Sequence, residues 1–318
     1  MNLRLPAAVA LCLLIAACSS SKSTGNSASA SNAPTGPATK TIGVSIQNRE
    51  AQFYQNMETG MKTEAAKYGY NVVVVDANRD SAKQQAQVED FISKKVDAIV
   101  LTPYDSQAIG AAIVEANNAN IPVFTADIAS TAKQGVVVAH IASDNVLGGE
   151  QAGKLMCQAV NNVGTIAIID QPEVTSVQDR VKGFRQAVKA NCPNVTIVAD
   201  VDGGGARDKA NSDMGDILQS HKELRGVFGV NDDSALGALA AIKAAGLKNI
   251  AVVGYDASPE ARAAIARGEM YGDAVQYPEK IGAMTIDTIH QDFVGQKVPK
   301  LVHVGVGTFT KANASTQP

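Results

Sequence analysis

The chain has 318 residues, and its 28 basic and 31 acidic side chains give a formal net charge of −3 at pH 7. A mildly acidic protein has no overall electrostatic attraction to nucleic acid, so we expect no nucleic-acid partner. Beyond residue 40 no segment is apolar over the roughly 20 residues that a membrane-spanning helix needs, and the length suffices for two domains of ordinary size.

The first 17 residues predict an export signal. Arg4 precedes an uncharged apolar stretch, residues 5–17, that is too short to span a membrane. The sequence IAAC at 15–18 resembles a bacterial lipobox, in which the cysteine is acylated and becomes the new amino terminus. The alternative is an ordinary signal with an incidental cysteine. We therefore expect a lipoprotein signal peptide at 1–17, and a protein that is exported to the periplasm or cell surface and anchored by lipidated Cys18.

Residues 18–40 predict a tether between the acylated cysteine and a folded body. After Cys18 the segment consists almost entirely of Ser, Ala, Gly, Pro, Asn and Thr, with too little apolar surface to fold, so we expect it to be disordered. Two further cysteines, Cys157 and Cys192, would remain in the mature fold. Export makes a disulfide between them possible, and two buried free thiols are the alternative.

From Thr41 onward, short β-branched runs alternate with helical stretches. Near-continuous apolar runs are typical of strands that are covered on both faces. Apolar residues spaced by four, such as Phe53, Met57 and Met61, predict the helices between them. The strands are expected at residues 41–46, 71–76, 98–102, 122–126, 136–142, 165–170, 194–200, 226–230, 250–255 and 301–306.

This alternation predicts an α/β protein with parallel sheets, because strand–helix–strand units cross over in one hand. The rhythm restarts at the strand 136–142, which leads into a helix at 148–159. One doubly wound sheet rarely carries so many strands. We therefore predict two doubly wound parallel-sheet lobes that join near 143–145, with one more helix at 278–294 before the last strand.

Polar side chains follow most of the predicted strands. Ligands of open α/β sheets bind beyond the carboxyl ends of the strands, and carboxylates and amides can each hold a pair of adjacent hydroxyl groups. Any single one could instead cap a helix, but the set favours a site for a polyhydroxyl ligand. The residues at these positions are Gln47, Asn48, Thr102, Asp127, Asp170, Gln171, Asn231, Asp232, Asp256 and Gln276.

Motifs for catalysis and for metal or cofactor binding are missing from the sequence. It contains no G-x-S-x-G, no G-x-x-x-x-G-K-[ST] and no H-E-x-x-H, and its four histidines are scattered. Three glycines at 203–205 lack the spacing of a dinucleotide fingerprint and predict a flexible loop near the cleft. We expect no enzyme activity, no metal site and no cofactor.

Four segments resemble the ribose-binding proteins of bacterial sugar importers, which have the type I periplasmic binding fold. They are HIASDNVLGG (140–149), VFGVNDDSALGALAAI (227–242), VVGYDASPEA (252–261) and GDAVQYPEKIGAM (272–284). The resemblance covers almost all of 41–310 and implies two α/β lobes joined by a hinge of three strands. The N-terminal lobe would be 41–143 plus 277–305, and the C-terminal lobe 144–276 plus 306–318.

The resemblance also implies ligand-binding roles for individual residues. Phe53 and Tyr54 match the aromatic pair that covers one face of the sugar ring, although Phe53 could simply be core. Asp127 matches the lobe-one carboxylate, and Arg180 the lobe-two arginine, which could instead pair with Asp179 on the surface. The polar ligands at strand ends of lobe two and the hinge correspond to Asn231, Asp256 and Gln276, and Thr102 stands where the family has an asparagine.

The sequence departs from the ribose-binding pattern at several positions. Ile128 replaces an arginine, which removes a bidentate donor. Gly205 replaces an aromatic residue, and Ala51 and Thr102 replace asparagines. The ligand is therefore expected to be a monosaccharide or polyol, with a pentose, a hexose and an inositol all open.

We predict a monomeric, lipid-anchored solute-binding protein that delivers this ligand to the permease of an ABC importer. The alternative is an exported sensor that presents a sugar or autoinducer to a chemoreceptor or sensor kinase. A LacI-type repressor shares the two-lobed core, but the polar tether stands where its helix-turn-helix would be. An enzyme is the remaining alternative.

Overall fold

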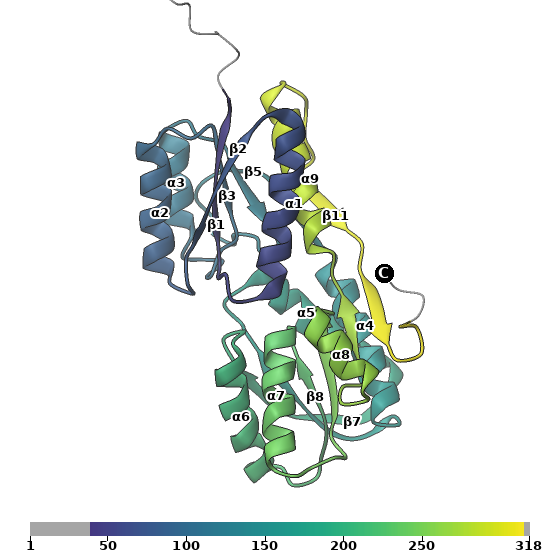
Figure 1. Ribbon diagram of the computed structural model, residues 1–318. Helices are drawn as coiled ribbons and strands as arrows, with labels where there is room; N and C mark the ends of the chain where they lie inside the picture. Colours follow the sequence, from purple (N-terminus) through teal and green to yellow (C-terminus); the bar gives the residue numbers. More distant parts are fainter. Residues whose placement is uncertain (1–38, 315–318) are drawn as a thin grey trace, which may run out of the picture. The chain divides into compact units, whose positions relative to one another are not determined.

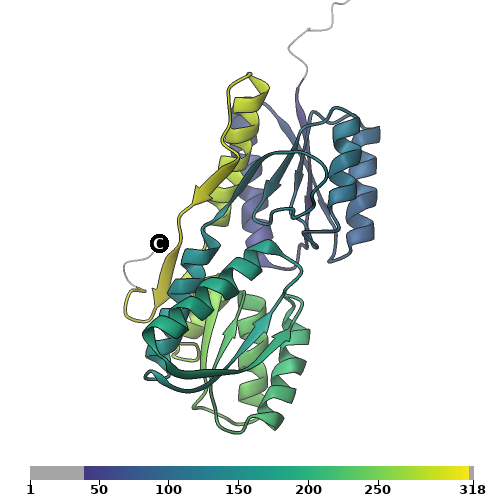
Figure 2. The same ribbon diagram turned by 180° about the vertical axis from the view of Figure 1, so that it is seen from behind.

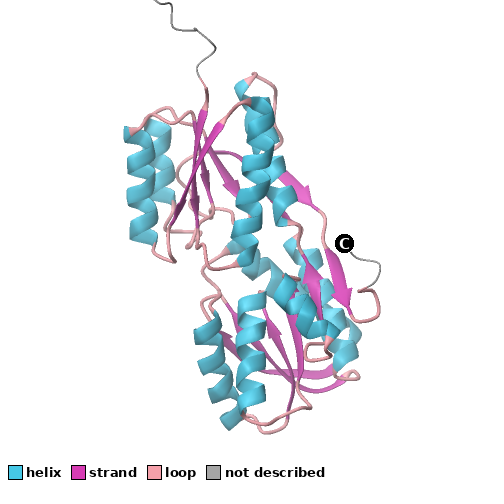
Figure 3. Cartoon of the chain, viewed as in Figure 1, coloured by secondary structure: helices cyan, strands magenta, loops and turns pink. Residues whose placement is uncertain are grey.

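A computed structural model describes residues 39–314 of the chain (Figure 1). The predicted signal peptide, Cys18 and nearly all of the predicted tether lie outside the described residues. Two six-stranded sheets form the framework, and each lies between two layers of helices (Figure 3). The prediction of two α/β lobes is thus confirmed.

The first sheet has the strand order β11-β5-β4-β3-β1-β2, and all its neighbouring strands are parallel. Its strands are β1 (Thr41–Ile46), β2 (Asn71–Asp76), β3 (Ala98–Leu101), β4 (Val123–Ala126), β5 (Val137–Ser143) and β11 (Leu301–Val304). The helices on one face are α1 (Gln52–Tyr68) and α9 (Pro278–Phe293), and those on the other are α2 (Ser81–Ser93) and α3 (Gly110–Asn118).

The second sheet repeats this arrangement with the order β12-β10-β9-β8-β6-β7. Its strands are β6 (Val163–Asp170), β7 (Asn194–Asp202), β8 (Leu224–Gly229), β9 (Ala251–Asp256), β10 (Gly272–Val275) and β12 (Gly307–Thr310). Its helices are α4 (Asn145–Ala159) and α5 (Thr175–Asn191) on one face, seen in front in Figure 2, and α6 (Arg207–Ser220), α7 (Asp232–Ala244) and α8 (Pro259–Ala266) on the other.

The end of the chain differs from the sequence prediction. The strand expected at 301–306 ends at Val304 as β11 of the first sheet, and an additional strand that was not expected, β12, begins at Gly307 in the second sheet. β12 pairs antiparallel with β10, so the second sheet is not entirely parallel.

The chain passes between the two sheets three times. It leaves β5 for α4 at Asp144, leaves β10 for α9 at 276–277, and leaves β11 for β12 at 305–306. The backbone N–H of Asp144 donates to the carbonyl of Val304 at 3.2 Å, so the first and third passages are adjacent. The lobe bounds that the resemblance implied, 41–143 plus 277–305 and 144–276 plus 306–318, remain a prediction.

Cys157 and Cys192 form a disulfide in the second lobe. Cys157 belongs to α4 and Cys192 follows α5, so the bond joins the two helices that cover one face of the sheet. Of the two alternatives left open by the sequence, the structure has the disulfide. Within residues 39–314, no helix combines the length and apolar character that a membrane crossing requires.

Candidate ligand-binding site

A small cavity lies where residues that follow strands of the two sheets approach each other. Its volume is about 30 Å³. The residues around it come from both lobes and include every residue to which the resemblance gave a ligand-binding role except Thr102. They are Gln47, Asn48, Ala51, Phe53, Tyr54, Asp127, Ile128, Gln171, Val174, Ser176, Val177, Arg180, Asn231, Asp256 and Gln276. Of the other polar residues predicted after strands, Gln47, Asn48 and Gln171 line the cavity, and Asp170 and Asp232 do not.

Thr102 is buried away from this cavity. Its backbone N–H donates to Ser45 of β1 at 2.9 Å, and its carbonyl accepts from the Gln84 side chain at 3.0 Å. The bond to Ser45 continues the ladder between β1 and β3 past Leu101, and the bond from Gln84 ties Thr102 to α2. The structure therefore does not bring Thr102 to the other predicted residues.

The aromatic pair lies at the start of α1. Phe53 and Tyr54 contact each other edge to face with ring centroids 5.2 Å apart, and each is 7% exposed. Phe53 both lines the cavity and packs in the core of the first lobe, so the two interpretations of this residue are compatible. The Tyr54 hydroxyl lies 3.3 Å from Asp127 Oδ2 and donates toward it.

Asp127 is the lobe-one carboxylate of the site. It follows β4 with a φ of +63°, a left-handed conformation that aspartate tolerates better than most residues. Its side chain is 3% exposed, and Oδ1 has no hydrogen-bond partner among the described residues. Burial raises the pKa of Asp127 to about 6, although the Arg180 charge and the Tyr54 hydrogen bond act in the opposite direction.

Arg180 reaches the cavity from α5 in the second lobe. Its Nε donates to Asn145 Oδ1 and its Nη1 to the carbonyl of Val230, both at 2.9 Å, and its guanidinium lies over the Tyr255 ring. Arg180 is 4% exposed, so it is not engaged in a surface pair with Asp179. These contacts direct Nη2 toward Asp127 Oδ1 of the other lobe, at 3.9 Å.

Asp256 and Gln276 form a second polar pair on the lobe-two side. Gln276 Nε2 donates to Asp256 Oδ1 at 2.7 Å, and the same oxygen lies 4.0 Å from Arg180 Nη1. Burial raises the pKa of Asp256, and the nearby Arg180 charge opposes this shift. Gln276 Oε1 is buried without a hydrogen-bond partner in the described chain.

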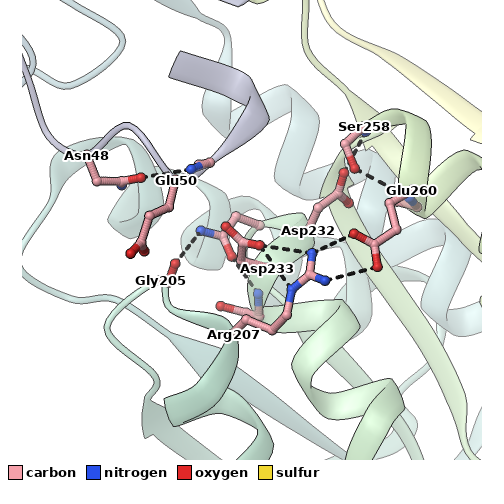
Figure 4. Close-up of polar contacts among 12 residues, drawn as sticks. Asn48, Glu50, Gly205, Arg207, Asp232, Asp233, Ser258 and Glu260 are labelled. Carbon is pink, nitrogen blue, oxygen red and sulfur yellow. Dashed lines mark hydrogen bonds and ion pairs between the residues drawn. The ribbon is translucent and has the colours of Figure 1, made fainter. Parts of the chain in front are cut away.

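Asn231 has a structural role as well as its place in the cavity wall. It is the N-cap of α7, where its Oδ1 accepts from the backbone N–H of Ser234 at 2.8 Å. Its Nδ2 donates to the carbonyl of Gly205 at 3.2 Å (Figure 4). The capping alternative thus applies to Asn231, whereas Asp127 and Asp256 are at no helix N-cap.

Asn145 is a residue of the site that the sequence did not single out. Its Oδ1 accepts from Arg180 Nε and, at 3.3 Å, from the Tyr255 hydroxyl, so it holds the arginine from behind. Asn145 lies in the segment HIASDNVLGG (140–149), on which the resemblance rested. That resemblance was the only feature of the sequence that could have indicated its role. A side chain in Gly149 of the same segment would meet the backbone oxygen of Arg180 at 2.0 Å.

Backbone and hydroxyl groups also join the lobes beside the cavity. Thr175 at the start of α5 exchanges hydrogen bonds with Ala129, which follows β4, and its own N–H donates to Ser106 Oγ at 3.0 Å. The backbone N–H of Ser106 donates to the carbonyl of Glu173, also at 3.0 Å. These contacts connect loops of the first lobe with the β6–α5 segment of the second.

A groove of about 1120 Å³ adjoins the cavity. The two share Ala51, Phe53, Asn231, Asp256 and Gln276, so the groove is the outer part of the same interlobe cleft. Near Asn231, Arg207 of α6 donates to Asp233 at 3.1 Å and to Glu260 at 2.8 Å, which links the ends of three helices (Figure 4). Within residues 39–314, no group of three or more His, Cys, Asp or Glu residues is arranged to hold a metal ion.

The fold and the cavity together define a two-lobed protein of the solute-binding class, with a cavity lined by residues of both lobes. A family model described as periplasmic binding protein domain matches residues 42–297, and the chain belongs to this family. It is 37% identical over 264 residues to a ribose import binding protein of Escherichia coli K12, covering 82% of this chain and 87% of that protein.

Solved structures have the same fold. An ABC transporter periplasmic solute-binding protein from Actinobacillus succinogenes 130z, with bound D-allose, superposes with a TM-score of 0.81 at 27% identity, covering 87% of this chain and all of that one. A solute-binding protein from Bacillus halodurans C-125, with bound myo-inositol, has a TM-score of 0.79 at 30% identity and covers 87% and 96%.

Proposed function

We propose that this protein captures a monosaccharide or polyol between its lobes and delivers it to the permease of an ABC importer. One observation carries the proposal. Four buried atoms around the cavity lack hydrogen-bond partners in the described chain: Gln47 Nε2, Gln171 Nε2, Asp127 Oδ1 and Gln276 Oε1. Two are donors and two are acceptors, and a hydroxyl group can satisfy either kind.

Buried polar atoms without hydrogen-bond partners destabilise the protein unless a ligand forms hydrogen bonds with them. A buried polar group without a partner costs about 1–3 kcal/mol. Hydroxyl groups of a sugar would recover this energy at several positions at once. A charged ligand would need a counter-charge, but Arg180 already lies near two carboxylates, so the cavity favours an uncharged one. The relatives with bound D-allose and myo-inositol support this choice of ligand class.

Binding requires the lobes to move. A cavity needs about 10–15 Å³ to hold one water, so about 30 Å³ is room for two and not for a sugar. We therefore propose that the lobes, 41–143 plus 277–305 and 144–276 plus 306–318, rotate about the three passages. Ligand contacts with Asp127 on one side and Arg180 and Asp256 on the other are available together only in a closed form, which shifts the population toward closure.

The proposed role is transport rather than catalysis. The sequence contains none of the catalytic motifs that were sought, and the polar groups of the site surround a cavity. The family to which the chain belongs consists of transport binding proteins. We also propose export under the signal at 1–17 and attachment through acylated Cys18. Two acyl signals hold a protein on a bilayer much more firmly than one.

A thermal-shift screen tests the proposal. Purified protein without the leader is melted alone and with D-ribose, D-allose, myo-inositol and other pentoses, hexoses and polyols. A ligand that binds only the native state raises the melting temperature as its concentration increases. The absence of a concentration-dependent rise with every sugar and polyol would contradict the proposed function.

Lipid attachment needs a separate experiment. Full-length protein expressed in a bacterial host is expected to partition with membranes, whereas Cys18→Ser is expected to partition with the soluble exported fraction. Equal partitioning of the two chains would exclude the anchor without affecting the proposed ligand.

A further inference from the structure

Two glutamines that the sequence placed after strands, but to which the resemblance gave no ligand-binding role, line the cavity from different lobes. Gln47 directly follows β1 in the first lobe, and Gln171 directly follows β6 in the second. They are 4% and 3% exposed, and both line the cavity. In each, the amide nitrogen is buried and has no hydrogen-bond partner within the described residues.

The orientation of the Gln47 amide follows from the backbone. The N–H of Ala51 donates to Asn48 Oδ1 at 2.9 Å (Figure 4), so the other end of the Asn48 amide must be its NH₂ group. That group donates to Gln47 Oε1 at 3.2 Å, and the Tyr54 hydroxyl lies 3.4 Å from the same oxygen. The oxygen of Gln47 is therefore engaged inside the first lobe, and its NH₂ group is left as the donor.

The position of Gln171 depends on Gly205. Gly205 has a φ of +61°, and a Cβ built there would lie 2.3 Å from Gln171 Oε1 and 3.2 Å from Asn231 Nδ2. The Gln171 side chain thus occupies space that any side chain at 205 would take. The absence of a side chain at Gly205, in the loop before α6, thus leaves room for the Gln171 amide, which extends from the end of β6.

We propose that Gln47 and Gln171 are further ligand-binding residues that determine specificity, each donating an amide N–H to an oxygen of the sugar or polyol from its own lobe. This inference rests on the proposed function. The two donors complement the carboxylate acceptors Asp127 and Asp256, so the preferred ligand has hydroxyl groups that face both kinds of partner. A site with such donors rejects an analogue that lacks the matching hydroxyl, because the amide is then buried without a partner.

Calorimetric titration of D-ribose, D-allose and myo-inositol into four proteins tests this inference. The proteins are the parent chain, Gln47→Leu, Gln171→Leu and the control Gln186→Leu, whose side chain is exposed on α5. We expect each cavity variant to bind the best of these ligands at least tenfold more weakly, and the control to bind it as the parent does. Unchanged affinity in both cavity variants would overturn the inference while leaving the proposed function intact.

The melting temperature without ligand separates binding from a structural role. Gln171→Leu removes a buried amide nitrogen that has no hydrogen-bond partner within the described residues, so we expect its melting temperature to equal or exceed that of the parent. A lower melting temperature together with unchanged affinity would indicate a structural role. Gln47→Leu also loses the hydrogen bonds that Gln47 Oε1 accepts, so we expect its melting temperature to be slightly lower than that of the parent. If Gln47→Leu does not fold, the result for Gln171→Leu decides the test.

Monodeoxy derivatives of the best ligand complete the test. For each amide, we expect one deoxy derivative that the parent binds at least tenfold more weakly than the intact ligand, whereas the matching leucine variant binds the two about equally. If every deoxy derivative loses the same factor in parent and variants, the amides do not contact the ligand and the inference is wrong. If the parent binds none of the three ligands, the proposed function fails for these ligands, and the inference fails with it.

Discussion

The carboxylates of the site are held near an arginine without being fully paired to it. Arg180 gives its two short hydrogen bonds to Asn145 and Val230, and its distances to Asp127 and Asp256 are 3.9 and 4.0 Å. The positive charge therefore offsets burial only in part, and the pKa of both carboxyl groups is raised. A ligand hydroxyl that donates to either carboxylate stabilises its ionised form.

This makes ligand affinity dependent on pH. Burial raises the pKa of Asp127 from 3.8 to about 6 in the ligand-free protein, while Arg180, Tyr54 and Asp256 face the same group. The acid form is thus populated at pH 5, and sugar binding must release its proton. We expect calorimetric affinity to rise about tenfold from pH 5 to pH 7 as Asp127 ionises, and to rise further above pH 7, because burial raises the pKa of Asp256 to about 7.

The contribution of Asp127 to the stability of the ligand-free fold changes with pH in the opposite direction to the ligand affinity. A carboxyl group with a raised pKa in the folded state stabilises the fold below its unfolded pKa, and this contribution is lost as the pH rises through about 6. Asp127→Asn should therefore flatten part of the pH dependence of both affinity and unfolding. An affinity that falls between pH 5 and pH 7 would contradict this assignment.

Removal of the Asp256 carboxylate is expected to weaken binding while the fold survives. Hydrogen bonds to charged groups contribute about 1.5–3 kcal/mol, so Asp256→Ala should lose about ten- to a hundredfold in affinity by calorimetry. Asp216→Ala on the exposed side of α6 is the control and should bind normally. Equal affinity in the two variants would remove Asp256 from the site.

At the scale of elements, glycines allow α4 and α5 to approach closely enough to position Arg180. A Cβ at Gly149 would lie 2.0 Å from the Arg180 carbonyl oxygen, and one at Gly183 would lie 2.0 Å from that of Val146. Because these neighbours are backbone atoms, they cannot move without moving a helix. The disulfide between Cys157 and Cys192 joins the same two helices toward their far ends.

Gly149→Ala is expected to destabilise the protein and displace Arg180. Overpacking of this kind costs about 1–3 kcal/mol, and chemical denaturation should detect it together with weaker ligand binding. The matched control is Gly215→Ala in α6, where a Cβ meets no atom within 4 Å. Because alanine is a better helix former, the control should gain about 0.5–1 kcal/mol. If Gly149→Ala had the same stability and ligand affinity as the parent, α4 and α5 would be able to move apart without cost, and this interpretation would be wrong.

At the scale of the whole molecule, the closure proposed above would depend on the contacts that join the lobes. The hydroxyl of Thr175 bonds to both backbone groups of Ala129 across the cleft, and Ser106 bonds to the same segment of the second lobe. An open form would exchange these bonds for bonds to water. In the proposed mechanism they would favour the closed form, although Thr175, Ala129 and Ser106 do not line the cavity.

Thr175→Val keeps the side-chain shape and removes the hydroxyl. A typical hydrogen bond contributes about 0.5–1.5 kcal/mol, so we expect affinity to fall about two- to tenfold through a less stable closed form. Thr288→Val, which removes a hydroxyl bond to Met284 within α9, is the control and should change stability without changing affinity. A Thr175→Val chain that binds as tightly as the parent would mean that these contacts do not govern closure.

The amino-acid sequence was enough to predict the two-lobed α/β class, most of the strands and most residues of the cavity, but it missed β10 and β12. Buried parallel strands appear in the sequence as short apolar runs. Because the carboxyl ends of parallel strands lie at the same edge of a sheet, Asp127, Asp256 and Gln276 could be identified from their positions directly after such runs. Arg180 came only from the resemblance, since a charged residue within a helix gives no sign of burial.

The tertiary structure alone decided which of these polar groups are satisfied and which are not. Thr102 follows a strand like the others but is held beneath Gln84, and Asn145 supports Arg180 through a contact between residues 35 positions apart. The free nitrogens of Gln47 and Gln171 likewise depend on partners elsewhere in the fold. Hydrogen-bond satisfaction is a property of three-dimensional neighbours, and no pattern along the chain specifies it.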